Sequence, residues 1–481
     1  MTLHSERLSA DIDIDVVGGQ RVLVLRATDL DAFEGFEGRR FDAADNRIIE
    51  GPLSETNAAA LRREFTHLQP RPLGTGTSAG VGDRLGLATP GQAAAFARHG
   101  RGVTPVFAQQ SIREMDRLGR SPRAVLDDAT FGCVIAGWTG RVGADLDHIR
   151  DVADIDRGID AGFTTFTLDP GDGVRNVASS AVEAAVTATN WSVLEDDIEA
   201  VLRRYAGVTV GLDTGSFTPS EQEVKRAVAK YGDAVALTAQ MSRHLASRNP
   251  NAYEIEVAVD ETAVETTLFE HHYLATELAR LGVRWVSMAP RYSDGFEKGL
   301  DFIGDKPTLI ENFAGHHAVA QLHGGYKISM HTGSDKFSVY PQLVEATAGR
   351  IHLKTSGTSW LTALAVIARR EPALLREIYR LSLESYVDAR ASYQVSADAE
   401  RAPRLDAVSD GELEEIVSLP DSRQILHVGY GAVLTATDDA GHRRMDADIR
   451  EVLLTHRDEY ALRLESHIGR HLTAFSEGAV S

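Results

Sequence analysis

From about residue 100 onward the chain alternates short β-rich runs with longer amphipathic stretches, and this order constrains the fold more than any other feature. Eight runs have the length and composition of strands: 103–109, the segment leading into GADLDH, 163–169, 208–213, 253–260, 283–290, 326–331 and 351–356. Most are followed by apolar residues at helical spacing, as in 268–282. The alternation predicts an α/β fold with a parallel sheet closed into a TIM-like (β/α)8 barrel. A doubly wound open sheet is the alternative.

The predicted barrel leaves a region on each side. We expect residues 76–370 to form the catalytic barrel and residues 1–75 to form an N-terminal α+β cap with one clear strand over 21–26 (RVLVLR). Residues 371–481 would be a helical C-terminal extension packed on the barrel. Within it, the pattern predicts a long helix over 370–400 and a late strand over 423–431 (RQILHVGYG).

Charge and cysteine content exclude several classes of function. The formal charge of −20 disfavours a nucleic acid or an anionic membrane as partner, so we expect a small-molecule ligand, and an anionic one would need a local basic pocket. The single cysteine, Cys133, excludes cysteine-based zinc clusters, so a metal site would use His, Asp and Glu. An acidic N-terminus without an apolar core, and no apolar run long enough to span a bilayer, predict a soluble cytoplasmic protein. A homo-oligomer is possible.

Polar side chains gather where the predicted strands end. In a parallel barrel these ends form one face, and active sites are built there. Buried charges without partners are costly, so such a concentration indicates a metal or a polar substrate. The residues concerned are Gln109, Gln110, Asp147, His148, Asp169, Asp172, Asp213, Glu256, Asp260, Glu261, Arg291, Glu297, His331, Asp335 and Lys354.

Glu256 and His331 are the most informative members of this set. Glu256 alternates with apolar residues inside YEIEVAVD, and neither face of a barrel strand favours a carboxylate, so a functional acid or ligand is preferred over an edge-strand glutamate. His331 ends an apolar strand beside an acid-rich rim, which makes a ligand about as plausible as a structural hydrogen-bonder. For His352, His271 and His272 the structural interpretation is favoured.

Two glycine- or serine-rich segments suggest anion binding. The run GTGTSAGVGDRLGLATPG (74–91) lacks the GK[ST] of a phosphate loop and the strand–GxGxxG–helix context, so it does not predict a nucleotide site. SGTSW (356–360) follows a strand and precedes a helix, where backbone N–H groups can bind an anion with Lys354 close by. Simple helix capping explains SGTSW equally well.

Several strings together resemble the tagaturonate/fructuronate epimerase family, metal-dependent enzymes of hexuronate breakdown. These strings, in the same order from about residue 80 to the C-terminus, are VGDRLGLATPG, PVFAQQSIREMDRLGRSPRAVLDDATFG, GADLDH, FTTFTLDPGD, EIEVAVDET, FEKGLDFIGD, YKISMHTGSDKFSVYP, IHLKTSGTSWLTAL and RQILHVGYGAVL. The resemblance implies an epimerase, an isomerase acting on carbohydrates, with a divalent cation as cofactor (Zn, Mn, Ni, Co or Fe). Residues 1 to about 70 match no known motif.

The resemblance also implies roles for individual residues. Asp147 would be the proton acceptor and Glu256 the proton donor, and His148 and His331 would bind the metal. For the third ligand we expect Glu297, with Asp169 as the alternative. The substrate carboxylate would be held by Lys354 with the SGTSW amides, or by Arg291 in a bidentate contact.

Tagaturonate and fructuronate differ at a hydroxyl-bearing carbon β to the ketone, which proton abstraction next to the ketone cannot invert. Retro-aldol cleavage followed by re-addition can invert it, and we prefer this route because the alternative, transient oxidation, needs a nicotinamide for which the sequence has no fingerprint. Gly173 and the SGTSWLTAL string depart from the family pattern and keep a neutral ketohexose (tagatose or fructose) open as substrate. A metal-dependent aldolase and a non-catalytic sugar-binding protein are the remaining alternatives.

Overall fold

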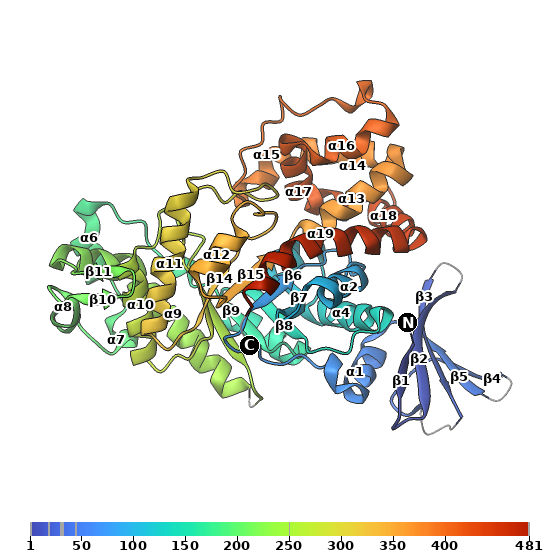
Figure 1. The fold of residues 1–481 in the computed structure, drawn as a ribbon, viewed down its shortest axis with the longest axis horizontal. Helices are drawn as coiled ribbons and strands as arrows, with labels where there is room; N and C mark the ends of the chain where they lie inside the picture. The colour runs from blue at the N-terminus through green and yellow to red at the C-terminus, as the bar shows by residue number, and fades with distance from the viewer. Residues whose placement is uncertain (1, 18–19, 29–32, 44–45, 250, 480–481) are drawn as a thin grey trace.

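A closed barrel of eight parallel strands forms the centre of the protein (Figure 1). The computed structural model describes residues 2–17, 20–28, 33–43, 46–249 and 251–479. The barrel strands are β6 (Ser78–Val81), β7 (Thr104–Ser111), β8 (Gly143–Ile149), β9 (Thr165–Leu168), β12 (Glu254–Ala258), β13 (Ser287–Ala289), β14 (Lys327–Met330) and β15 (Ile351–Thr355). Pairing of β9 with β12 and of β15 with β6 closes the ring, so the barrel prediction is confirmed and the open sheet is wrong.

The first barrel strand was not among the predicted eight. β6 has the sequence SAGV and lies inside the glycine-rich run 74–91, where small residues hide the strand pattern. Gly80 is required there, because a Cβ atom would come within 2.9 Å of the Gln109 side chain. The glycine therefore marks a close approach inside the barrel lumen, as glycine in a strand often does.

The predicted strand 208–213 is not part of the barrel. Only β10 (Val210–Leu212) forms there, and it pairs antiparallel with β11 (Gly215–Phe217) in a small hairpin. The hairpin belongs to an insertion between β9 and β12 that also contains α6 (Val182–Thr187), α7 (Trp191–Leu194) and α8 (Ile198–Tyr205). The hairpin residues are largely exposed, so the β-forming residues at 210–212 build a surface hairpin and do not contribute to the barrel core.

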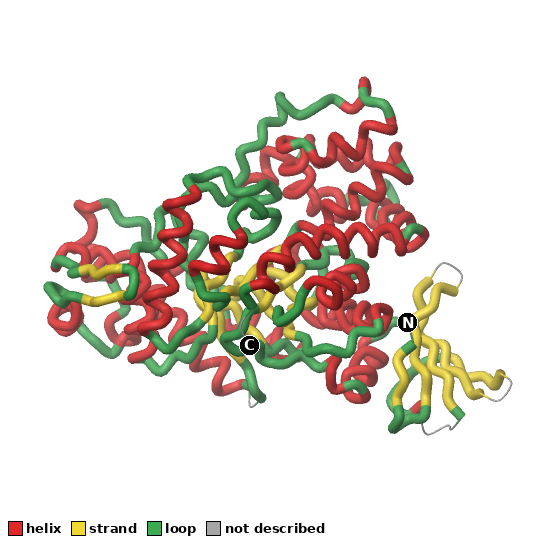
Figure 2. Tube along the Cα trace, in the orientation of Figure 1, coloured by secondary structure: helices red, strands yellow, loops and turns green. Residues whose placement is uncertain are grey.

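Helices surround the barrel (Figure 2). They are α2 (Thr89–His99), α3 (Ile112–Leu118), α4 (Pro122–Ala136), α5 (Val152–Ala161), α9 (Glu221–Arg248), α10 (Leu268–Arg280), α11 (Lys306–Leu322), α12 (Tyr340–Ala346) and α13 (Thr358–Arg370). Both α9 and α10 begin with a capping box, Ser220 with Glu223 and Thr267 with Glu270. These caps fix where each long helix starts after its loop.

The N-terminal region is a five-stranded antiparallel sheet with the order β1-β2-β3-β5-β4. Its strands are β1 (Leu3–Ser5), β2 (Ala10–Val17), β3 (Gln20–Ala27), β4 (Arg39–Ala43) and β5 (Asn46–Gly51), and α1 (Glu55–Glu64) follows. The predicted strand 21–26 lies within β3. The sheet and α1 pack against α4 on the outside of the barrel (Figure 1). No described residue of 1–75 lines the central pocket, so this region does not cover the active face.

All regular secondary structure described in the C-terminal region is helical. It contains α14 (Pro372–Glu384), α15 (Tyr386–Ala389), α16 (Leu413–Ser418), α17 (Pro420–Thr435), α18 (Arg444–Thr455) and α19 (Arg457–Glu477). The predicted long helix over 370–400 ends at Glu384. The predicted strand 423–431 is wrong, because these residues lie in α17. Gly429 and Gly431 make the sequence look unfavourable for a helix. They are needed for packing, because a Cβ atom at either position would come within 2.6 Å of Ser382 or Arg117.

Asp335, from the string SDKFS, fastens α17 and α19 to the barrel. Its carboxylate accepts hydrogen bonds from Arg423 and His467, both at 2.6 Å, and its backbone N–H donates to His471 Nε2 at 3.0 Å. The three residues Asp335, His467 and His471 could by type hold a metal. However, the Asp335 carboxylate already pairs with Arg423, and His471 Nε2 already accepts a hydrogen bond from the Asp335 backbone N–H. The group therefore has a structural role: it joins α17 and α19 to the barrel.

We expect Asp335→Asn to lower the free energy of unfolding by about 3 kcal/mol at neutral pH, because it leaves the Arg423 charge without its partner. Burial opposes ionisation, but the hydrogen bond from His467 and the charge of Arg423 hold the pKa of Asp335 well below its usual range. A depressed native pKa gives stability that is present above the unfolded pKa of about 4 and is lost below it. Urea denaturation should therefore show a deficit that shrinks in acid. Asp458→Asn, at an exposed position of α19, should change nothing.

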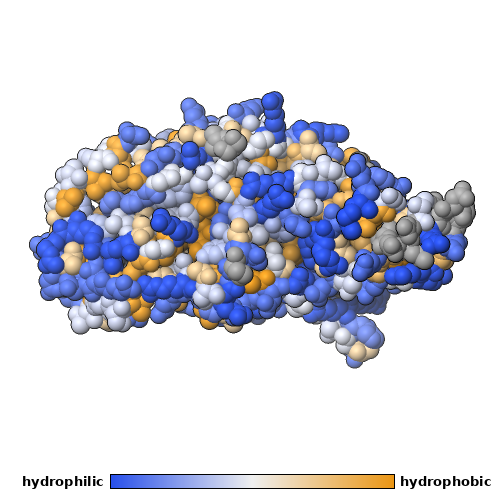
Figure 3. Space-filling view, turned by 90° about the horizontal axis from the view of Figure 1, so that it is seen from below, coloured by the Kyte–Doolittle hydropathy of each residue, from blue (hydrophilic) through white to orange (hydrophobic). Residues whose placement is uncertain are grey.

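The outer surface agrees with the acidic composition. Hydrophilic residues cover most of the face seen in Figure 3, and hydrophobic residues are scattered among them. In the part of the chain that the structure describes, no helix has the length and apolar character needed to cross a membrane.

Candidate active site

A cavity of about 490 Å³ lies at the carboxyl ends of the barrel strands. Its floor includes Asp147, His148, His331 and Lys354 from β8, β14 and β15 or the residues that follow them. The C-terminal region contributes Ala391, Tyr393 and Gln394 to the opposite wall. These four residues thus converge, and a segment far away in sequence lies across the cavity from them.

A bulge in β8 explains how neighbouring residues Asp147 and His148 reach the same cavity. The register between β8 and β9 shifts between Leu146 and Ile149, and His148 has a φ of +55°, in the left-handed region. A regular strand would point the two side chains to opposite faces, but a bulge re-aims one of them. Such strain in a non-glycine residue is typical of functional sites.

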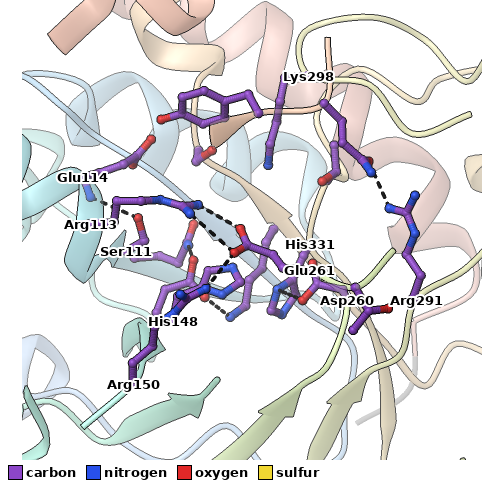
Figure 4. Close-up of a pocket in the computed structure, with 18 of the residues that line it drawn as sticks. Ser111, Arg113, Glu114, His148, Arg150, Asp260, Glu261, Arg291, Lys298 and His331 are labelled. Carbon is purple, nitrogen blue, oxygen red and sulfur yellow. Dashed lines mark hydrogen bonds and ion pairs between the residues drawn. The ribbon is translucent and has the colours of Figure 1, made fainter. Parts of the chain in front are cut away.

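The two imidazoles predicted as ligands lie together on the cavity floor. The ring centroids of His148 and His331 are 5.0 Å apart, and each ring offers a nitrogen within 4.8 Å of an Asp147 oxygen (Figure 4). His148 Nδ1 contacts Asp169 Oδ2 at 3.0 Å, and His331 Nε2 contacts Glu256 Oε1 at 2.5 Å. Each histidine is therefore oriented by a carboxylate and keeps one nitrogen for another partner.

Asp260 faces the remaining nitrogen of His331. Its Oδ1 lies 3.2 Å from His331 Nδ1, and both atoms are buried without hydrogen-bond geometry to any described partner. Burial opposes protonation, but Asp260 and Glu256 raise the pKa of His331 to about 10. The pKa of His148 is also raised, against burial, by Asp147 and Asp169. Buried carboxylates thus attract positive charge to the cavity floor.

Lys354 lies beneath the histidines and binds three carboxylates. Its Nζ is 2.8 Å from Asp145 Oδ2, 2.7 Å from Asp147 Oδ1 and 2.8 Å from Glu256 Oε1. The side chain is 2% exposed. Although burial opposes charge, the carboxylates raise the pKa of Lys354 well above its usual value, so it stays protonated. Burial alone would raise the pKa values of Asp147 and Glu256, but the positive charge of Lys354 lowers both.

Glu297, predicted as the third metal ligand, is not brought to the histidines. Its Oε2 accepts hydrogen bonds from Ser396 and Gln424, which hold it against the C-terminal region. Glu297 is not among the described residues that line the cavity. Glu297 stands in a long loop after β13, where position in sequence does not fix the direction of a side chain. Asp169, the alternative, does contact His148.

The predicted carboxylate-binding groups are already engaged. Lys354 is surrounded by acids, and Arg291 binds Gln394 and Asp294, both at 2.9 Å. Of the SGTSW segment, Ser356 lines the cavity, whereas Thr358, Ser359 and Trp360 are buried. Neither proposed anion site is therefore free in the form that the sequence suggested.

Three features of the site were not assigned a role from sequence. Asp145 lies below Lys354, and Gln109 donates to Asp147 Oδ2 at 3.1 Å. At the mouth, Arg113 and Arg150 both bind Glu261, at 2.8 and 3.0 Å (Figure 4). Gln109 and Glu261 were visible as strand-end residues, but only the three-dimensional pairing distinguishes supporting residues from those that face a ligand.

Comparison with known proteins gives consistent matches over nearly the whole chain. A family model described as tagaturonate epimerase matches residues 15–475. The chain is 38% identical over 420 residues to a tagaturonate/fructuronate epimerase of Thermotoga maritima, which covers 86% of this chain and 84% of the relative. A glycerol complex of fructuronate-tagaturonate epimerase from Cohnella laeviribosi matches with a TM-score of 0.92 and 32% identity, covering 100% of this chain and 96% of the other. A native structure of that enzyme matches with a TM-score of 0.92 and 31% identity, at the same coverage.

Proposed function

Because the chain belongs to the tagaturonate epimerase family and is therefore an epimerase, we propose that it interconverts D-tagaturonate and D-fructuronate. The observation that carries this proposal is the similarity over the full chain to a fructuronate-tagaturonate epimerase. The cavity supports it, since ionised carboxylates and two imidazoles surround a space large enough for a sugar acid. Incubating either ketouronate with the purified protein and resolving the product by chromatography tests it: failure to form the other ketouronate would refute it.

We propose that inversion proceeds by retro-aldol cleavage and re-addition. The hydroxyl on the carbon β to the ketone loses its proton, and the bond between this carbon and its neighbour next to the ketone breaks. An aldehyde fragment and an enediolate result. The aldehyde rotates, the carbon–carbon bond forms again on its other face, and the new alkoxide takes up a proton. No atom or electron is gained or lost overall.

Asp147 is the proposed acceptor of the hydroxyl proton. It lines the cavity, it is ionised, and the lone pairs not used by Lys354 and Gln109 can accept a hydrogen bond. Glu256 lies one layer deeper, against His331 and Lys354. We propose that Glu256, which is ionised at rest, gains the proton accepted by Asp147 through Lys354, whose Nζ touches both carboxylates, and returns it to the new alkoxide.

The residues present fit a divalent cation. His148 and His331 each use one ring nitrogen to contact a carboxylate, an arrangement common for metal-binding histidines. We propose Asp260 as the third ligand, in preference to Asp147, because its Oδ1 is buried without a hydrogen bond. A cation bound by these residues would polarise the substrate ketone as a Lewis acid.

Removal of the metal should abolish turnover. Dialysis against a chelator is expected to lower kcat by at least about 100-fold, and adding one divalent metal back at a time should restore it. Elemental analysis of the protein before dialysis identifies the physiological ion. Unchanged circular dichroism after dialysis is the control for unfolding. Full activity in protein shown to be metal-free would contradict the metal site.

A further inference from the structure

The cationic side chains around the cavity differ in whether an acid already neutralises them. Five lysine or arginine residues line it: Arg113, Arg150, Arg291, Lys298 and Lys354. Lys354 binds three carboxylates, Arg113 and Arg150 share Glu261, and Arg291 binds Asp294. Within the described residues, Lys298 alone of the five has no carboxylate oxygen within 4.0 Å of its charged group.

Lys298 is also placed to act on a ligand. It stands in the loop between β13 and α11, and its backbone N–H donates to the Gln394 carbonyl at 3.1 Å. Figure 4 shows its side chain entering the cavity from the side of the C-terminal segment, with the amine end directed inward and well separated from His148 and His331. The side chain is half-buried, so its charge is partly desolvated and less screened than at the surface.

We propose that Lys298 binds the carboxylate of the substrate and makes the enzyme specific for ketouronates over neutral ketohexoses. The inference rests on the proposed function. In a ketouronate the carboxylate lies at the opposite end of the carbon chain from the ketone. With the ketone at the histidines, the carboxylate extends toward the wall that Lys298 occupies. A protein of net charge −20 repels anions elsewhere, so a cation without an acidic partner is needed here.

A ketohexose carries an uncharged hydroxymethyl group where a ketouronate carries the carboxylate. Lys298 would therefore form a charge-assisted hydrogen bond with one substrate and an ordinary one with the other. This difference affects binding along the whole reaction path, so loss of the lysine should raise KM for the ketouronate more than it lowers kcat.

The test compares Lys298→Met, Lys298→Arg and the native enzyme, all loaded with metal, on D-fructuronate and on D-tagatose. The neutral sugar is used as a substrate, or as a competitive inhibitor where its turnover is slow. Lys298→Met should lower kcat/KM for the ketouronate by about 10- to 100-fold, with kcat largely kept, and change the value for the neutral sugar less than about threefold. Lys298→Arg should recover part of the loss. Lys306→Met, an exposed lysine outside the cavity, controls for the removed charge.

The outcomes separate the two proposals. If native enzyme fails to epimerise the ketouronate, the proposed function is wrong whatever Lys298 does. If native enzyme is active and Lys298→Met keeps its efficiency on the ketouronate, the inference is overturned. Equal losses on the charged and the neutral sugar would also overturn it, because they would indicate a structural role for the side chain.

Discussion

We expect Asp147→Asn to lower kcat for ketouronate epimerisation by about 10²- to 10⁴-fold, the usual contribution of a general base. Asparagine keeps the shape of the side chain but cannot accept the hydroxyl proton. Lys354 keeps Asp145 and Glu256 as partners, so no buried charge is left alone and the protein should stay folded. The measurements are kcat and KM from initial rates, together with a thermal denaturation curve that should resemble that of the native enzyme.

Asp172→Asn is the matched control for this prediction. The Asp172 side chain is 70% exposed at the rim, where it lies 3.6 Å from Arg150. An exposed pair of this kind contributes little, so kcat should remain near that of the native enzyme. Retention of more than a tenth of native activity by Asp147→Asn would remove Asp147 from the role of base. Equal impairment of both variants would show that rim charge, and not proton transfer, limits the rate.

The barrel could be predicted from the order of elements, although not every strand could. The barrel prediction does not depend on every strand being correct, because helices of the right length still separate the other strands when one is misplaced. The hairpin strand at 210–212 has strong β propensity but little burial, whereas β6 has weak propensity and full burial. Propensity measures fit to a pleated surface, and it cannot report which surface will be covered.

The same distinction holds for the site. Residues on a strand or directly after it, such as Lys354 and His331, could be placed because the carboxyl ends of parallel strands meet at one face. The bulge that turns His148 toward the cavity could not be predicted from the sequence; it is seen in the register shift of β8 and in the positive φ of His148. Glu297 and Lys298 are adjacent in one loop, and only the structure shows that the first points to the C-terminal region and the second into the cavity.

Replacement of Lys354 by methionine should abolish turnover and destabilise the protein by about 3–5 kcal/mol at neutral pH. The lysine is the only positive charge within 4.0 Å of Asp145 in the described structure, and it lies between Asp147 and Glu256. Without it, three buried carboxylates repel one another and lack compensation. Urea denaturation followed by circular dichroism measures the loss.

The loss should depend on pH in a defined direction. In the native enzyme Lys354 lowers the pKa values of Asp147 and Glu256, so its stabilising effect is present above the unfolded pKa of about 4 and fades in acid. In the variant the uncompensated carboxylates have raised pKa values. Their folded state therefore gains protons and stability as pH falls. The difference in unfolding free energy between the two proteins should narrow from pH 7 towards pH 4.

Lys327, on the neighbouring strand β14, provides the matched control because it is a second buried lysine of the barrel lumen. Its Nζ donates to Ser78 Oγ at 3.0 Å, and among the described residues no carboxylate oxygen comes within 4.0 Å of it. Burial lowers the pKa of Lys327, which means that its positive charge destabilises the folded state. No carboxylate lies close enough to form an ion pair that would compensate for this effect among the described residues. Lys327→Met should therefore cost at most about 1 kcal/mol, since it removes that destabilising charge along with one hydrogen bond. If both methionine variants lose the same stability, side-chain packing and not charge compensation holds the centre of the barrel together.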